Sequence, residues 1–211
     1  MGANLCKWIL VGILGLTAVP VIGQVALGVR AGLARTSYTQ KVDLDYQSGS
    51  RFGYSMAVMA DIPFYHRFSF RPEIAVENQG GKYFTYRNES GAPRLKYKSN
   101  YYSLQIPLNI AFNIPITGVR MAVFGGPAPN FHLSGKMKVE GVGEEPSYDE
   151  KKMKTFDLGI NSGISVEYKH VFFSIDAFYG TLDRRVDKYE NESRVYHNNI
   201  TFSLGYFFRP G

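Results

Sequence analysis

Apolar and polar residues alternate strictly along residues 102–114, and the same period of two returns in seven further stretches of the chain. Every second residue from Tyr102 to Ile114 is apolar, whereas those between are small or polar, apart from Pro107. Because successive side chains of a strand point to opposite faces, this period predicts a strand with one apolar and one polar face. A tilted strand of about 9–11 residues crosses a lipid bilayer, so this stretch is long enough to span one.

The eight stretches account for most of the chain after residue 24. The fifth contains Pro127 and Pro129, which have no amide hydrogen to donate to a sheet, so we expect a bend or bulge there. The predicted strands cover residues 25–34, 52–62, 68–77, 102–114, 119–134, 156–168, 173–180 and 199–208.

Short and long connections alternate between these strands. Long loops at one end and tight turns at the other are typical of outer-membrane barrels, in which the turns and both termini are periplasmic. We therefore predict an all-β fold: an eight-stranded antiparallel up-and-down transmembrane β-barrel with four long extracellular loops and short periplasmic turns. The short connections lie around 63–67, 115–118 and 169–170, and the long ones at roughly 37–50, 78–100, 134–155 and 183–197.

A soluble lipocalin-like barrel or sandwich is the alternative, since it shows the same alternation with its apolar face turned inward. The polar face here is rich in Gly, Ala, Ser and Asn, which suit a narrow lumen better than a soluble surface. Aromatic residues also gather at the strand ends beside the short turns, as in the girdle of a membrane barrel. These predicted girdle residues are Phe64, Phe68, Phe112, Tyr168, Phe173 and Phe208.

The N-terminus has the layout of a secretory signal peptide. Lys7 precedes an apolar run from Trp8 to Val19, and Gly23 supplies a small residue at the cleavage position. We expect a signal peptide at 1–23, a barrel domain at 24–211 and a location in the outer membrane. Cys6 is the only cysteine and leaves with the signal, so the mature chain forms no disulfide.

Several segments resemble the PorT-type outer-membrane β-barrel domain. In chain order they read GVRAGLA, YYSLQIPLNIAFNI, VFGGPAPNF, DLGINSGISVEYKHVFFSIDAFYG and ITFSLGYFF. The resemblance covers nearly the whole mature chain and implies the same barrel fold. The family includes a component of type IX secretion, so it also implies a secretion role as one function. The chain departs from the pattern in adding Arg209, Pro210 and Gly211 after the terminal aromatic Phe208.

The interior of an eight-stranded barrel is just wide enough for its own side chains, so we expect a filled lumen and no open pore. Charges removed from water need partners. A simple turn at 63–67 places Asp61 opposite Arg71, and Arg120 and Glu167 are neighbours on the fifth and sixth strands. We predict a structural ion-pair network, with a path for protons or ions as the alternative. The predicted network comprises Arg30, Asp61, Arg71, Glu73, Arg120, Glu167 and Asp176.

His132 and Ser134 form the one pattern that points to an enzyme. On one strand face they place a base near a hydroxyl nucleophile, and with Glu140, Glu144 or Glu145 they resemble the arrangement in lipid A deacylases. We expect that face to point into the lumen, whereas such enzymes attack acyl chains from the lipid side. We therefore predict no catalytic residue. The four histidines are scattered singly, so no metal or cofactor site is predicted either.

The predicted loops carry charges of both signs with tyrosines among them. Mixed charge is ordinary for a surface, and its Lys and Arg side chains can contact lipopolysaccharide phosphates; a protein-docking surface is the alternative. The formal net charge of +6 is spread along the chain, so nucleic acid is not an expected partner. One loop contributes the basic residues Lys82, Arg87, Arg94, Lys96 and Lys98.

We thus predict a non-enzymatic barrel with a structural or protein-interaction role through its extracellular loops. Its expected partners are outer-membrane lipid, lipopolysaccharide and other envelope proteins. A component of a type IX-like secretion machinery is the first alternative, and an outer-leaflet lipid A-modifying enzyme is the second.

Overall fold

The computed structural model describes residues 25–42, 45–85, 95–139, 143–146, 154–184 and 194–209, in which every regular element is a β-strand. None of these residues belongs to a helix long and apolar enough to cross a membrane. The strands are β1 (Ala26–Val42), β2 (Asp45–Tyr65), β3 (Phe68–Thr85), β4 (Leu95–Gln105), β5 (Leu108–Ile116), β6 (Val119–Val139), β7 (Gly143–Pro146), β8 (Phe156–Tyr168), β9 (Val171–Gly180) and β10 (Val195–Phe208).

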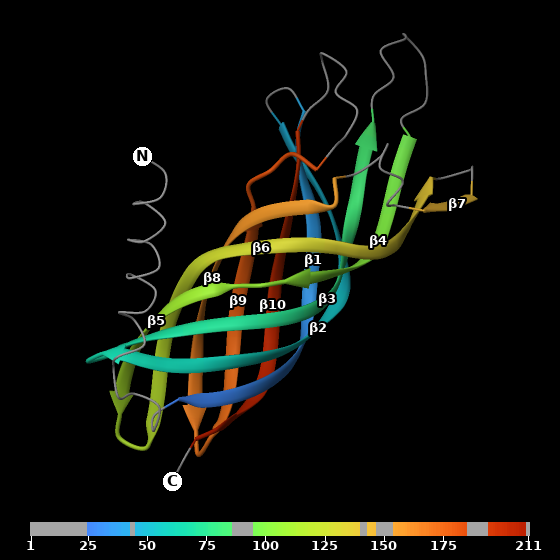
Figure 1. Cartoon of the computed structure of the whole chain (residues 1–211). Helices are drawn as coiled ribbons and strands as arrows, with labels where there is room; N and C mark the ends of the chain where they lie inside the picture. The colour runs from blue at the N-terminus through green and yellow to red at the C-terminus, as the bar shows by residue number, and fades with distance from the viewer. Residues whose placement is uncertain are drawn as a thin grey trace, which may run out of the picture.

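The strands form a closed antiparallel ring (Figure 1). Consecutive strands pair from β1 to β4, from β5 to β7 and from β8 to β10. β6 also pairs with β8, and β1 pairs with β10 to close the ring. β4 and β5 follow one another along the same gap between β3 and β6, so together they occupy one position. β7 pairs only with the end of β6. The ring therefore has eight positions, and the predicted up-and-down barrel is confirmed.

Exposure alternates along the strands with the apolar residues outside. Leu33 is 69% exposed, whereas the next residue, Ala34, is 1% exposed. The same pattern continues along β8, where Ile160 and Ile164 are exposed and Asn161 and Ser165 are buried. An apolar outer surface of this kind suits lipid, not water. The soluble alternative, with its apolar face turned inward, is excluded.

Three short turns lie at one end of the barrel, which we call the short-turn end. They fall at residues 66–67, 117–118 and 169–170. β1 begins and β10 ends at this same end, because Leu27 pairs with Phe208. The predicted girdle is exposed there, with ring centroids 6.4 Å apart for Phe64 and Phe68 and 5.2 Å apart for Phe68 and Phe112.

At the opposite end, the long-loop end, the sheet extends further than the alternation predicts. The ladder between β1 and β2 continues to the pair Val42 and Asp45, inside the predicted loop at 37–50. β3 and β4 likewise stay paired to Thr85 and Leu95, inside the predicted loop at 78–100. Beyond the lipid the outward face meets water, so the apolar period stops, whereas backbone pairing continues and the inward face stays buried at Tyr38 and Tyr101.

The predicted irregularity at Pro127 and Pro129 falls on the partner strand instead. β6 passes both prolines in unbroken register with β8. The neighbouring strand is interrupted between β4 and β5 at Ile106 and Pro107. There the Ile106 amide donates to the Pro129 carbonyl at 2.9 Å. Because the two prolines have no amide hydrogen for this side of the ladder, their partner strand breaks while β6 continues.

Candidate functional site

The lumen is the candidate site, because the inward face of the sheet carries most of the buried charge. Arg30, on β1, lies at its centre and is 5% exposed. Its Nη2 atom lies 2.5 Å from Glu73 Oε1, and its Nη1 atom lies 2.9 Å from Asp176 Oδ1. Nη1 also donates to Ser203 Oγ at 2.7 Å. One arginine thus links β1, β3, β9 and β10 across the lumen.

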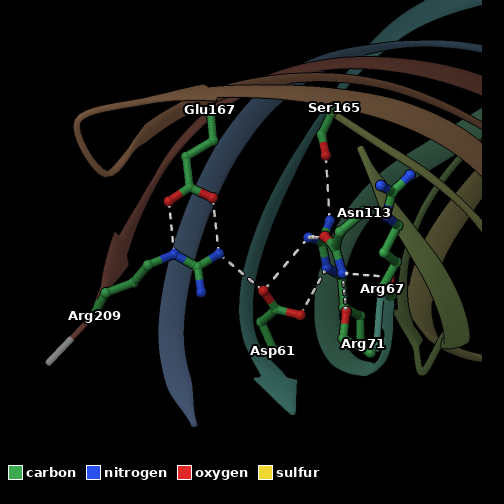
Figure 2. A network of polar contacts seen from close by, with 8 residues as sticks. Asp61, Arg67, Arg71, Asn113, Ser165, Glu167 and Arg209 are labelled. Carbon is green, nitrogen blue, oxygen red and sulfur yellow. Dashed lines mark hydrogen bonds and ion pairs between the residues drawn. The ribbon is translucent and has the colours of Figure 1, made fainter. Parts of the chain in front are cut away.

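A second network lies nearer the short-turn end (Figure 2). Arg71, on β3, places its Nε atom 3.0 Å from Asp61 Oδ1 on β2, the predicted pair across the hairpin. Its guanidinium also donates to Ser165 Oγ at 3.2 Å and to Asn113 Oδ1 at 2.8 Å. Buried charge here has both an ionic partner and further hydrogen bonds, as its removal from water requires.

Arg209 completes this second network and was not predicted. Figure 2 shows it reaching from the end of β10 to Glu167 and Asp61. It donates to both Glu167 carboxylate oxygens, at 2.7 and 2.8 Å, and to Asp61 Oδ2 at 2.8 Å. Its guanidinium also lies 4.7 Å from the ring centroid of Phe207. Two parallel N–H···O bonds to one carboxylate are the strong form of this interaction.

The structure does not bring Arg120 into the network. Arg120 lies opposite Glu167 in the register of β6 and β8, as expected, but its side chain is exposed. Across the described residues it makes no ion pair, and Arg209 binds the Glu167 carboxylate instead. The period of two could have revealed this: Phe208 faces lipid, so the next residue faces the lumen.

A third group surrounds Glu77, which is 1% exposed on β3. Its carboxylate accepts hydrogen bonds from the side-chain amides of Asn199, at 2.8 Å, and Gln79. Ser55 Oγ adds a longer contact at 3.4 Å. Amides therefore hold this carboxylate, which none of the described arginines reaches in an ion pair.

The lumen near the long-loop end is buried but less completely paired. Arg184, Asp157 and His197 are all fully buried. Arg184 donates through Nη1 to the Phe156 carbonyl at 2.8 Å, whereas its Nε and Nη2 atoms find no hydrogen-bond partner among the described residues. The same holds for Asp157 Oδ2 and both ring nitrogens of His197. Sequence reasoning missed Arg184, because it lies after β9, in a predicted loop.

Free space in the lumen is small. A cavity between the two arginine networks measures about 10 Å³ and is lined by Arg30, Arg71, Glu73, Phe124 and Phe207, among others. That volume holds about one water molecule. In the described part of the chain no group of three or more His, Cys, Asp or Glu residues could hold a metal ion. The described side chains of the lumen can therefore hold the barrel wall together, and this cavity is too small for a substrate.

Comparison with known proteins identifies the family to which the chain belongs. Residues 19–183 match the family described as "Outer membrane protein beta-barrel domain". The chain belongs to this family. Together with the apolar outer surface, this membership places the protein in the cell outer membrane.

Solved outer-membrane barrels are similar to this family member at low sequence identity. The attachment invasion locus protein Ail of Yersinia pestis has 16% identity and a TM-score of 0.46, covering 88% of this chain and 99% of its own. Neisserial surface protein A has 16% identity and a TM-score of 0.44, covering 85% and 96%. OprG of Pseudomonas aeruginosa has 11% identity and a TM-score of 0.44, covering 88% and 96%. No curated protein sequence matches the chain significantly.

His132 and Ser134 do not share a face of this outer-membrane barrel, so that expectation is wrong. Between β4 and β6, Ser103 pairs with His132 but Tyr102 pairs with Ser134, which leaves Leu133 as an extra residue. His132 faces the lumen, 6% exposed, whereas this bulge turns Ser134 outward. Of the proposed acids, Glu140 lies outside the described residues, and Glu144 and Glu145 lie on β7.

Proposed function

We propose that this protein is a non-enzymatic outer-membrane barrel with a closed lumen that acts through its outer surface and extracellular loops. The observation that carries the proposal is the pair of arginine networks. Arg30 and Arg71 each bridge the lumen to carboxylates within 3.0 Å. The other six residues of the predicted network then have a structural role, and Arg209 takes the place of Arg120 as the partner of Glu167.

Conductance in planar bilayers tests the closed lumen against the ion-path alternative. Because the ionic bridges and packed side chains fill the cross-section, the purified barrel should give no steady current. A stable conductance that scales with salt concentration would contradict the proposal. The variant Arg30→Ala removes a central bridge and serves as a positive control, since it should raise the frequency of current events.

We further propose that residues 1–23 are a cleaved export signal and residues 24–211 the mature barrel. The signal segment lies outside the described residues, and the apolar run from Trp8 to Val19 supports the assignment. N-terminal sequencing of protein from outer membranes should begin at Gln24. A mature chain that retains Lys7 would contradict it.

Outer-membrane lipid and lipopolysaccharide are the partners we propose first, with other envelope proteins as further partners. The opposite orientation of His132 and Ser134 supports the non-enzymatic assignment over lipid A modification. Mass spectra of lipid A from cells with and without the protein should therefore be the same. A mass difference of one acyl chain would overturn this part of the proposal.

A PorT-like role in protein secretion is the second candidate function, supported by the sequence segments that resemble that family. Co-purification from outer membranes distinguishes the secretion role from the first proposed function. A stable complex with other envelope proteins after gentle detergent extraction is the result that favours secretion. A barrel that purifies alone under the same conditions favours the first proposal.

A further inference from the structure

A row of lysines crosses the outer face of the barrel near the long-loop end. Lys82 on β3 pairs with Lys98 on β4, and Lys98 pairs with Lys138 on β6. Adjacent strands lie about 4.8 Å apart, so the row spans about 10 Å. Like charges directly opposite one another destabilise a sheet. Glu144 on β7 lies opposite Lys138 at one end of the row, so the repulsion is strongest between Lys82 and Lys98, where an anion would reduce it.

These lysines border a shallow hollow of about 280 Å³. Lys136 and Arg51 also line it, and none of its described lining residues is acidic. Arg51 is held in place beneath the row, donating to Asn100 Oδ1 at 2.6 Å and to Asn78 Oδ1 at 2.9 Å. The hollow thus has a fixed cationic floor, formed by Arg51, with lysine side chains around it.

The hollow lies just beyond the lipid-facing surface. On β4, Leu104 and Tyr102 face outward below it, and the Tyr102 hydroxyl lies 3.0 Å from the Tyr54 hydroxyl. Lys98 is four residues further on, about 13 Å along the strand. Tyrosines mark the edge of the apolar layer. The row therefore stands at the level of the lipid headgroups and faces away from the lumen.

We infer that this hollow binds the phosphate groups of a phosphorylated glycolipid headgroup in the outer leaflet, namely lipopolysaccharide. The row spans several ångströms, so it matches a ligand with more than one phosphate. Its position beside the apolar surface lets the same ligand place its acyl chains against the barrel. The inference deepens the proposed contact with lipopolysaccharide and rests on that proposal.

The test compares the variant K98Q/K138Q with the wild type in zwitterionic detergent. The probe is lipopolysaccharide that retains its lipid A phosphates. Each lysine near a charged surface contributes about 1 kcal/mol, so the double variant should bind about 10- to 30-fold more weakly. Wild-type affinity should also fall as salt rises. The matched control R67Q/K169Q changes two exposed charges at the short-turn end and should stay within about twofold of wild type.

Two further arms, together with the main comparison, separate the outcomes. Dephosphorylated lipopolysaccharide should bind wild type as weakly as intact lipopolysaccharide binds the variant, and equal binding of both forms overturns the phosphate assignment. Soluble pyrophosphate should compete poorly with lipopolysaccharide. Full competition would show that the hollow binds a free anion and not a lipid headgroup. If K98Q/K138Q binds like wild type, the site is wrong although lipopolysaccharide remains a partner. If wild type binds no lipopolysaccharide, the site and the proposed partner fail together.

Folding of the variant is checked by the shift of the unheated protein on a detergent gel. Without lipopolysaccharide the variant should be as stable as wild type or slightly more so, because repulsion within the row is removed. Added lipopolysaccharide should raise the thermal midpoint of wild type and leave that of the variant unchanged. Should the double variant not fold, K98Q and K138Q are measured singly, each with about a fivefold loss of affinity.

Discussion

The two halves of the lumen treat buried charge differently. Towards the short-turn end, Arg71 and Arg209 share Asp61, and each also has partners of its own. Towards the long-loop end, Arg184 and Asp157 are equally buried, yet both retain polar atoms without a hydrogen-bond partner in the described chain. Burial alone therefore does not tell how much a charge contributes to stability. What matters is whether its partners lie within bonding distance, and variants can measure that difference.

The largest effect is expected for Arg30→Met. It leaves Glu73 and Asp176 buried without their cation, and breaking a buried pair in this way costs about 3–5 kcal/mol. Urea titration in lipid vesicles, followed by the gel shift, measures the free energy of unfolding. Arg35→Met on the same strand is the control, because Arg35 is exposed and should change stability by less than about 0.5 kcal/mol. Equal losses in both variants would show that the central bridge is not stabilising.

Arg209→Met should have an intermediate effect. The side chain is 14% exposed, so water compensates part of the lost contacts with Glu167 and Asp61. We expect a loss of about 1–3 kcal/mol in the same titration. Arg120→Met, opposite Glu167 in register, should be nearly neutral. If Arg120→Met lost more stability than Arg209→Met, Arg120 would be the functional partner of Glu167.

The smallest effect is expected for Asp157→Asn at the long-loop end. The amide keeps the oxygen that accepts from the Leu182 backbone and replaces an oxygen that has no partner. The loss should therefore be about 1 kcal/mol or less. Asp61→Asn is the matched change at the other end and should cost more, since two arginines lose an ionic partner there. Similar losses for both would remove the distinction between the two halves.

Much of the fold was predictable because lipid imposes a strict pattern. Each residue that faces the acyl chains must be apolar, so the period of two located the strands and identified their outer faces. The same pattern predicts no strand beyond the part of the barrel that faces lipid. Residues 37–42 and 78–85 continue the strands without the apolar period. Backbone pairing holds them in the sheet together with inward contacts, such as the packing of Tyr38 with Tyr101 and Met137.

The lumen was harder to predict than the wall. Alternation placed Arg30 and Arg71 inside, but it assigns no partners beyond the adjacent strand. The link from Arg30 to Asp176 crosses 146 positions of the chain and depends on ring closure. The extra residue at Leu133 exchanges the inward and outward faces for the residues that follow it on β6. No turn-forming residue marks this bulge in the sequence. Parity counted along the sequence therefore failed at Ser134.

Arg209 connects the segment after β10 to closure of the ring. It follows the last residue of β10 and contacts Asp61 on β2 and Glu167 on β8, which flank the β1, β10 and β9 sector of the ring on either side. Those contacts can form together only after β1 and β10 have met. Pairing of β1 with β10 therefore brings Arg209 to both carboxylates at once, and a barrel still open along that seam lacks this bridge between β2 and β8.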